Sequence, residues 1–162
     1  MIGKINSGGQ TGVDQAALRA AEACGIATGG WAPKGWRTEE GPAPWLAEFG
    51  LREHPSGDYP DRTRANVRDA GLTLILIGHE SDLARGTALT LRVAQAGRGD
   101  GIDHYVSVMS QPGAVERCRD VLQWFAEAGG GVVNVAGPRE SESPGIGEWA
   151  EKFLREVFQQ PA

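Results

Sequence analysis

Cysteine is scarce in this 162-residue chain, and long apolar runs are absent. The two cysteines, Cys24 and Cys118, fall on the apolar stripes of predicted helices, and neither has a neighbour at metal-binding spacing. We expect both to be buried thiols. No apolar run reaches transmembrane length, and no charged segment followed by an apolar one opens the chain. We therefore expect a cytoplasmic protein without a membrane partner.

Histidine and positive charge are also in short supply. His54, His79 and His104 are isolated from one another, so we expect no protein-side metal site. A net charge of −5 argues against general nucleic-acid binding, which normally needs a basic surface. Residues 34–68 nevertheless gather one lysine and five arginines among glycine-rich turns. Such a cluster fits an anionic small molecule better than a polymer.

Strand-like and helical patterns alternate along the chain. The clearest strand, Leu72–Ile77, is apolar on both faces, as in the centre of a parallel sheet. The alternation predicts an α/β fold: a Rossmann-like three-layer sandwich with a mainly parallel sheet covered by helices on both faces. We expect one ligand-binding domain spanning residues 1–162. The other expected strands are 2–6, 26–31, 104–109 and 132–135. The expected helices are one that begins at about residue 12, and those at 61–70, 88–96, 114–128 and 146–158.

Residues 29–44 are rich in glycine, proline and tryptophan and show neither helical nor strand periodicity. We expect a long loop there, and a loop of that length is usually functional. Trp31 and Trp36 either stack on a flat ligand ring or anchor the loop. A short helical turn and a brief strand are expected within 46–53. The candidate binding residues of this loop are Lys34, Gly35 and Arg37.

The segment Ile2–Asp14 combines a short strand, a glycine turn and a helix start. This arrangement points backbone N–H groups and the positive end of a helix dipole at one place, which suits a phosphate. It lacks the glycine spacing of the Rossmann dinucleotide turn and the lysine of a P-loop. Many such turns bind nothing, so that alternative stays open. The candidate ligand residues here are Gly8, Gly9, Gln10, Thr11, Gly12 and Asp14.

Three further stretches would meet at the same edge of a parallel sheet, outside the carboxyl ends of its strands. Arg62, Asn66 and Asp69 form a polar stripe on the helix expected at 61–70, either solvated or lining a site. A second glycine-containing helix start follows the strand at 72–77, and a third loop follows the last strand. The additional candidate ligand residues are Arg62, Asn66, Gly86, Thr87, Gly137, Arg139, Glu140 and Ser141.

Five blocks of this sequence together resemble a known family, the putative molybdenum carrier family. They are SGGQTGVDQAAL at 7–18, GGWAPKGWRTEEG at 29–41, YPDRTRANV at 59–67, GTALT at 86–90 and NVAGPRES at 134–141. That family is Rossmann-like and related to the lysine-decarboxylase-like (LOG) group, whose enzymes cleave nucleoside 5′-monophosphates. The resemblance implies a homologue that binds a phosphate-bearing, nucleotide-like molecule, with the molybdenum cofactor or a nucleotide as ligand.

The resemblance also leaves open whether the chain is an enzyme. The LOG enzymes carry a catalytic glutamate in a glycine-rich block, and Thr90 stands where that glutamate would be. A threonine cannot act as the carboxylate acid–base. Three functions therefore remain: a cofactor carrier, a nucleotide hydrolase (N-glycosidic or phosphoester), and a nucleotide sensor. An apolar helix expected at 84–96 suggests a homo-oligomer. Alternative acid–base residues on the candidate loops are Asp14, Glu39, Glu40 and Glu140.

Overall fold

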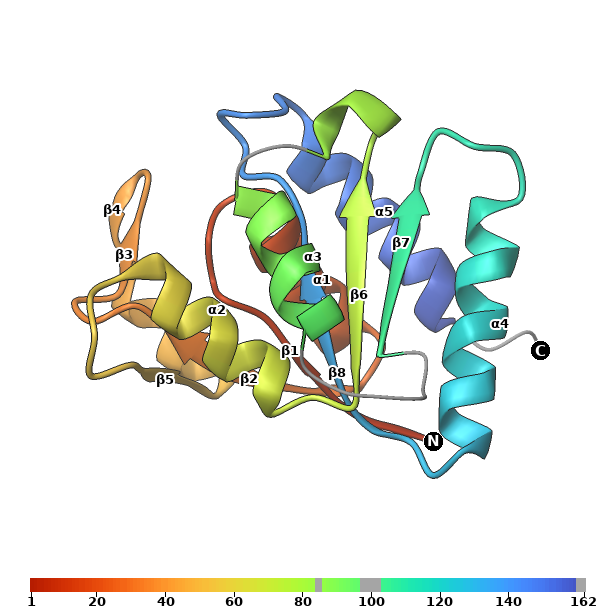
Figure 1. The fold of residues 1–162 in the computed structure, drawn as a ribbon, viewed down its shortest axis with the longest axis horizontal. Helices are drawn as coiled ribbons and strands as arrows, with labels where there is room; N and C mark the ends of the chain where they lie inside the picture. Colours follow the sequence, from red (N-terminus) through yellow and green to blue (C-terminus); the bar gives the residue numbers. More distant parts are fainter. Residues whose placement is uncertain (84–85, 97–102, 160–162) are drawn as a thin grey trace.

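Within the part of the chain that the structure describes, six parallel strands form one sheet in the order β5-β2-β1-β8-β6-β7 (Figure 1). The computed structural model describes residues 1–83, 86–96 and 103–159. The expected apolar helix at 84–96 therefore lies partly outside the described residues. The strands are β1 (Ile2–Asn6), β2 (Ala27–Ala32), β5 (Leu51–Glu53), β6 (Leu72–Ile77), β7 (His104–Val108) and β8 (Gly131–Ala136).

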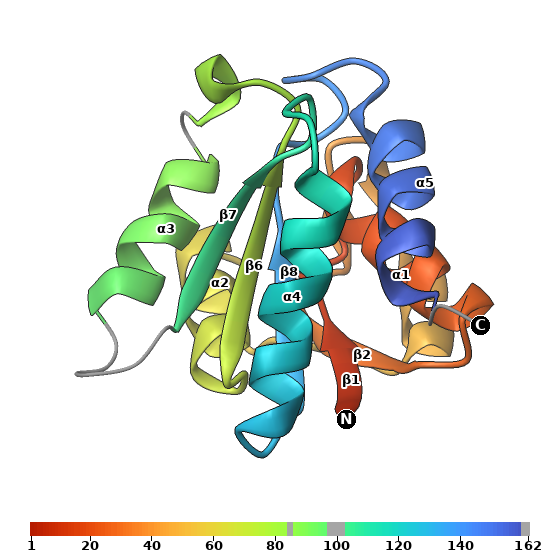
Figure 2. The ribbon, with the colours of Figure 1, turned by 90° about the vertical axis from the view of Figure 1, so that its right-hand side faces the viewer.

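Helices cover both faces of this sheet, which confirms the predicted Rossmann-like three-layer fold. Figure 2 shows α2 and α3 on one side, and α1, α4 and α5 on the other. Among the described helices, none is long and apolar enough to cross a membrane. The helices are α1 (Val13–Ala23), α2 (Tyr59–Arg68), α3 (Gly86–Ala96), α4 (Ala114–Glu127) and α5 (Ile146–Phe158).

The main apolar core lies between the sheet and the layer formed by α1, α4 and α5. Alternate strand residues such as Ile5, Leu74 and Val133 point into it and are fully buried. Helix α5 lays its apolar face against α1 and α4 because its hydrophobic residues recur at helical spacing. The helical spacing at 146–158 also predicts Trp149 on that face, but this residue is 37% exposed, and its ring lies edge-on to His79.

The opposite face of the sheet, beneath α2 and α3, is more polar. Asn6 of β1 stands in register with Asn134 of β8, which stands in register with Thr73 of β6. All three are buried, and each alternates with strand residues that belong to the main core. The sheet thus carries a row of buried polar side chains near its centre. Burying an asparagine there costs free energy unless its amide is hydrogen-bonded.

Residues 29–44 are not the structureless loop that the sequence predicts. Its first residues complete β2, and a small antiparallel hairpin follows, built from β3 (Arg37–Thr38) and β4 (Gly41–Pro42). The strands are too short to show any periodicity. A 3₁₀ helix, η1 (Pro44–Phe49), leads into β5, as expected for 46–53.

Both tryptophans of this segment serve as anchors. Trp36 packs against a second, smaller core that includes Leu18 and Leu46. Trp31 donates its indole N–H to Asp69 at 2.8 Å, and its ring lies beneath the Arg52 guanidinium. The anchoring alternative therefore accounts for both rings.

The two cysteines differ in burial. Cys118 of α4 is fully buried, as predicted. Cys24 is only half-buried, because it follows the last residue of α1 and lies at the margin of the apolar layer. The expectation of a buried thiol is therefore wrong for Cys24.

Candidate functional site

The loops that follow β1 and β8 meet at the carboxyl edge of the sheet, where these strands lie side by side. In Figure 1 this edge is at the top of the sheet, and the β3–β4 hairpin projects beside α2. The chain leaves β1 toward α1 and leaves β8 toward α5. In parallel α/β sheets, ligands bind outside the carboxyl ends of the strands.

The first glycine turn is held together by its own polar groups. The N–H of Gly9 donates to Ser7 Oγ at 3.3 Å. The N–H of Gln10 donates to the Asp14 carboxylate at 3.2 Å, and that of Thr11 donates to Gln10 Oε1 at 3.0 Å. A phosphate near this turn would therefore be held by side chains around it, and not by these three N–H groups.

Two glycines of this turn allow protein atoms to approach closely. A Cβ on Gly8 would lie 1.5 Å from Arg62 Nη1, and one on Gly12 would lie 2.4 Å from the Pro138 carbonyl oxygen. The N–H of Val13, the first residue of α1, donates to that same carbonyl at 3.2 Å. The glycines thus bring the first turn, α2 and the loop after β8 into contact.

Asp14 and Arg62 form a buried ion pair in this contact region. Arg62 Nη1 lies 3.5 Å from Asp14 Oδ2, and the two side chains are 12% and 7% exposed. Burial raises the pKa of Asp14 above its ordinary value of 3.8, although the charge of Arg62 acts in the opposite direction. Burial likewise lowers the pKa of Arg62. Its Nε is buried without a hydrogen-bond partner among the described residues.

Three arginines from three segments converge on the ring of Tyr59. The guanidinium carbons of Arg37, Arg62 and Arg139 lie 5.8, 5.6 and 6.0 Å from the ring centroid. Arg139 also pairs with Glu142 at 3.1 Å. The charge of Arg139 contributes to lowering the pKa of Arg62, so these positive groups repel each other and the arrangement gains from a nearby anion. Cation–π attraction to the half-buried Tyr59 ring offsets part of that repulsion.

Glu39, at the tip of the β3–β4 hairpin, joins two of these loops. Its carboxylate accepts hydrogen bonds from the Thr11 hydroxyl and from both the N–H and the hydroxyl of Ser141. Its own N–H donates to Gln10 Oε1 at 3.0 Å. Partial burial raises the pKa of Glu39, but the hydrogen bonds from Ser141 and Thr11 outweigh it, so the pKa falls below 4.5.

Glu140 caps the start of α5. Its carboxylate accepts the N–H of Gly145 at 2.6 Å and that of Gly147 at 3.0 Å. A carboxylate at a helix N-terminus satisfies free N–H groups and interacts favourably with the helix dipole. The backbone N–H of Glu140 donates to the Thr11 hydroxyl at 3.2 Å. A direct role of this side chain toward a ligand stays a prediction.

Lys34 and Gly35 lie on an exposed turn between β2 and the hairpin. The N–H of Lys34 donates to the Ser56 carbonyl at 3.0 Å, and the N–H of Gly35 donates to the Glu53 carboxylate. These contacts tie the turn to the segment that follows β5. Their assignment to the ligand stays a prediction.

Arg62 and Asn66 of the predicted polar stripe face the site and β2, whereas Asp69, which directly follows α2, is exposed to solvent. Asn66 is 2% exposed, and its amide pairs with the backbone of Trp31: Oδ1 accepts the N–H at 2.8 Å and Nδ2 donates to the carbonyl at 3.0 Å. Asp69 accepts the Trp31 indole N–H. Of the three stripe residues, Arg62 is the one that reaches the arginine cluster.

The other two predicted cradles lie beside β6. Gly86 begins α3, and Thr87 is 3% exposed, with a hydroxyl that has no hydrogen-bond partner among the described residues. Gly137 follows β8, where a Cβ would lie 2.4 Å from the Leu76 carbonyl oxygen and 2.6 Å from Val13 Cγ2. Gly137 is therefore required for close packing of α1 against the sheet.

Comparisons with known proteins agree with this fold. The model of the circularly permutated YpsA SLOG family (cpYpsA) matches residues 5–158. The chain belongs to this family. A crystal structure of a "putative molybdenum carrier protein" from Syntrophus aciditrophicus SB superposes with a TM-score of 0.84 at 36% identity, covering 98% of this chain and 96% of that one. No match is found among curated proteins. The resemblance stated from the sequence blocks is confirmed.

In this cpYpsA chain, the residue at the LOG glutamate position lies inside α3. Thr90 is 6% exposed, one turn beyond Thr87. The buried carboxylate that the structure places next to an arginine at the carboxyl edge is instead Asp14. Among the described residues, no group of three or more His, Cys, Asp or Glu side chains could hold a metal ion.

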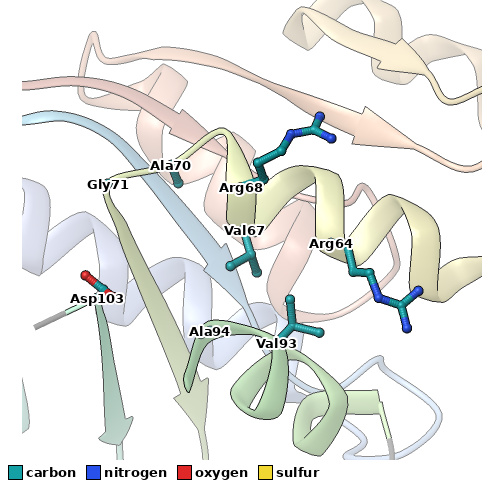
Figure 3. Close-up of a pocket in the computed structure, with 8 residues that line it drawn as sticks. All are labelled: Arg64, Val67, Arg68, Ala70, Gly71, Val93, Ala94 and Asp103. Atoms are coloured by element: carbon teal, nitrogen blue, oxygen red, sulfur yellow. The ribbon is translucent and has the colours of Figure 1, made fainter. Parts of the chain in front are cut away.

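Two clefts flank α2 of this family member. One lies in front of Tyr59, next to the arginine cluster, and its wall includes Arg37, Asp58 and Arg64. The other lies between α2 and α3 near the amino ends of β6 and β7, with Val67, Val93 and Asp103 among its lining residues (Figure 3). The second cleft is thus at the opposite edge of the sheet from the candidate site.

Sequence reasoning missed three parts of this site. Tyr59 is not among the candidate residues predicted from the sequence, although aromatic and arginine residues lie in the same block, 59–67. Glu39 was considered only as an acid–base candidate. The polar row of Asn6 and Asn134 is not predicted from the sequence either. Asparagines at or near the ends of predicted strands are informative, because polar side chains are rarely buried without a specific role.

Proposed function

We propose that this chain binds a phosphate-bearing, nucleotide-like small molecule at the carboxyl edge of the sheet, and that it acts as a carrier of the molybdenum cofactor. The observation that carries the proposal is the convergence of Arg37, Arg62 and Arg139 on Tyr59. Three guanidinium groups in one place supply the planar, charged donors that recognise phosphate oxygens.

The geometry suggests how such a ligand would be arranged. Its phosphate would lie among the three guanidinium groups, and its ring system would extend into the cleft in front of Tyr59. The ligand would then be recognised through its phosphate, with any metal carried by the ligand itself. The name of the Syntrophus relative, a molybdenum carrier, supports the molybdenum cofactor over a plain nucleotide.

The ligand can be identified by mass spectrometry of protein purified gently from its own host and then denatured. We expect a released phosphate-bearing pterin and a molybdenum signal in proportion to the protein. The matched control is an Arg139→Ala preparation, which should release much less of the same compound. Release of a nucleotide instead would contradict the carrier function and would favour a nucleotide enzyme or sensor.

A second candidate, nucleotide hydrolysis, rests on the environment of Asp14. Its carboxyl group is buried beside the arginine cluster, and burial raises its pKa, as a general acid requires. In N-glycosidic hydrolysis, Asp14 would donate a proton to the leaving base while a water molecule attacks the ribose carbon from which the base departs, and the nearby Arg62 would bind the phosphate. Glu140 is less suited because its carboxylate caps α5.

Hydrolysis is tested by incubating the protein with nucleoside mono- and diphosphates and measuring free base and free phosphate. Turnover that disappears in Asp14→Asn but persists in Glu140→Gln would support the second candidate. Binding of the same compounds without turnover would favour the carrier. A ligand-dependent change in oligomeric state, measured by light scattering, would instead indicate the sensor function.

A further inference from the structure

The carboxylate of Glu39 lies in a set of donors that is built for an anion. Three donors converge on it: the Thr11 hydroxyl, the Ser141 hydroxyl and the Ser141 N–H at 3.1 Å. Thr11 and Ser141 come from the loops after β1 and β8, so the fold itself brings these donors together. Glu39 reaches them from a separate hairpin, 28 residues from Thr11 and 102 residues from Ser141 in sequence.

The orientation of these groups favours an acceptor-only partner. The Thr11 hydroxyl accepts the Glu140 N–H at 3.2 Å, so its proton is directed outward, toward Glu39. A backbone N–H cannot accept a hydrogen bond, so the Ser141 N–H adds a fixed donor beside it. Carboxylate and phosphate oxygens both satisfy such a set.

Charge links this donor set to the arginine cluster. Asp14 pairs with Arg62 and Glu142 with Arg139, and the charge of Arg139 also contributes to lowering the pKa of Glu39. Without a ligand, Glu39 thus supplies a third negative charge near the three guanidinium groups. A phosphate bound among these groups would be repelled by the Glu39 carboxylate at close range.

We infer that Glu39 occupies an oxyanion subsite formed by Thr11 and Ser141, and that a phosphate-bearing ligand displaces it in order to bind. The inference rests on the proposed function. It says which residues contact the oxyanion of that ligand, and which side chain those residues hold before the ligand binds. The chemical class recognised is a terminal phosphate or another tetrahedral oxyanion.

The hairpin that carries Glu39 is suited to such a displacement. Each of its strands has two residues, and Glu39 and Glu40 form its exposed tip. The Trp36 ring holds its base against the small core. Segments with few buried contacts open at low free energy, so the tip can move while the base stays in place.

The test is calorimetric titration of AMP and of inorganic phosphate into wild type, Glu39→Gln and a control, Glu48→Gln. Glu48 is an exposed carboxylate on η1, so the control removes the same charge outside the donor set. If the Glu39 carboxylate occupies the donor set in about nine-tenths of the wild-type molecules, Glu39→Gln should bind the ligand about tenfold more tightly. The affinity of the control should stay within about twofold of wild type. Thermal unfolding of each variant verifies that it is folded.

Three outcomes separate the possibilities. Tighter binding by Glu39→Gln alone supports displacement, and Ser141→Ala combined with Glu39→Gln should then abolish the gain. Unchanged or weaker binding by Glu39→Gln, with wild type binding AMP, overturns the inference and leaves the proposed function standing. Failure of wild type and of both variants to bind either compound overturns the inference together with the proposed phosphate recognition.

Discussion

Arg62 on α2 and Asp14 on α1 form an ion pair, 3.5 Å apart, that links two helices on opposite faces of the sheet. The pair passes beneath Gly8, where no side chain could be accommodated without moving Arg62. Its geometry holds one guanidinium of the arginine cluster in place. The stability of the fold and the shape of the candidate site are therefore connected through these two residues.

Replacing Arg62 should destabilise the protein strongly. Arg62→Met leaves the Asp14 carboxylate buried without its counter-charge, and breaking a buried pair in this way costs about 3 kcal/mol. Arg64→Met, on the same helix, removes an exposed arginine paired with Asp61 and should cost less than about 1 kcal/mol. Urea denaturation of the two variants measures the free energies of unfolding. Equal effects would contradict a buried, structural pair.

The cost of Arg62→Met should depend on pH. A folded-state pKa of Asp14 above the unfolded value means that stability falls as pH rises from about 3.8, and removal of Arg62 raises that pKa further. The difference in the free energy of unfolding between wild type and Arg62→Met should therefore widen as pH rises. It should narrow as pH falls toward the pKa of Asp14 in the unfolded chain. Denaturation curves between about pH 4 and pH 7 measure this difference. A difference independent of pH would show that Asp14 is not the group responsible.

Gly12 should be far less tolerant than another glycine with a similar backbone angle. Gly12 and Gly25 have φ of 78° and 72°, but only at Gly12 does an added Cβ meet backbone atoms, 2.4 Å from the Pro138 oxygen. Gly25→Ala should cost about 1–2 kcal/mol for the left-handed backbone alone. Gly12→Ala should cost at least about 2 kcal/mol more, because the loop after β8 must shift. Chemical denaturation compares the two, and equal costs would contradict the close approach.

The two thiols should differ in reactivity. Burial raises the pKa of Cys118 to about 12, so this residue carries almost no thiolate in the folded protein. Cys24 is half-buried and should react with a thiol reagent under native conditions. We expect one thiol to react before unfolding and two in urea. In Cys24→Ser none should react before unfolding, and rapid native labelling of that variant would contradict the burial of Cys118.

The sheet and most of its helices could be predicted from the sequence because their signals are local. Leu72–Ile77 is apolar on both faces and is β6 with the same bounds, and the helical spacing at 146–158 gives α5. The hairpin at 37–42 could not be predicted, because two-residue strands have no measurable period. Trp149 was misplaced because helical spacing does not show where a helix passes beyond the edge of the sheet.

The candidate site could be predicted less completely. The glycine and arginine positions predict which edge of the sheet carries the candidate site, and the structure brings Arg37, Arg62 and Arg139 together there. The sequence does not show which polar groups satisfy one another. Asn66 pairs with the backbone of Trp31 and Glu140 with the start of α5, and both pairings depend on tertiary contacts.

The most direct test of phosphate recognition is calorimetric titration of phosphate-bearing pterins and nucleotides into wild type, Arg37→Ala and Arg155→Ala. Arg37 belongs to the cluster on Tyr59, whereas Arg155 is a partly exposed arginine of α5 paired with Glu151. We predict binding by wild type and Arg155→Ala, and a loss of about tenfold or more in Arg37→Ala, as expected for one charge-assisted contact. Equal affinity in all three proteins, or no binding to wild type at millimolar ligand, would contradict an arginine-lined phosphate site.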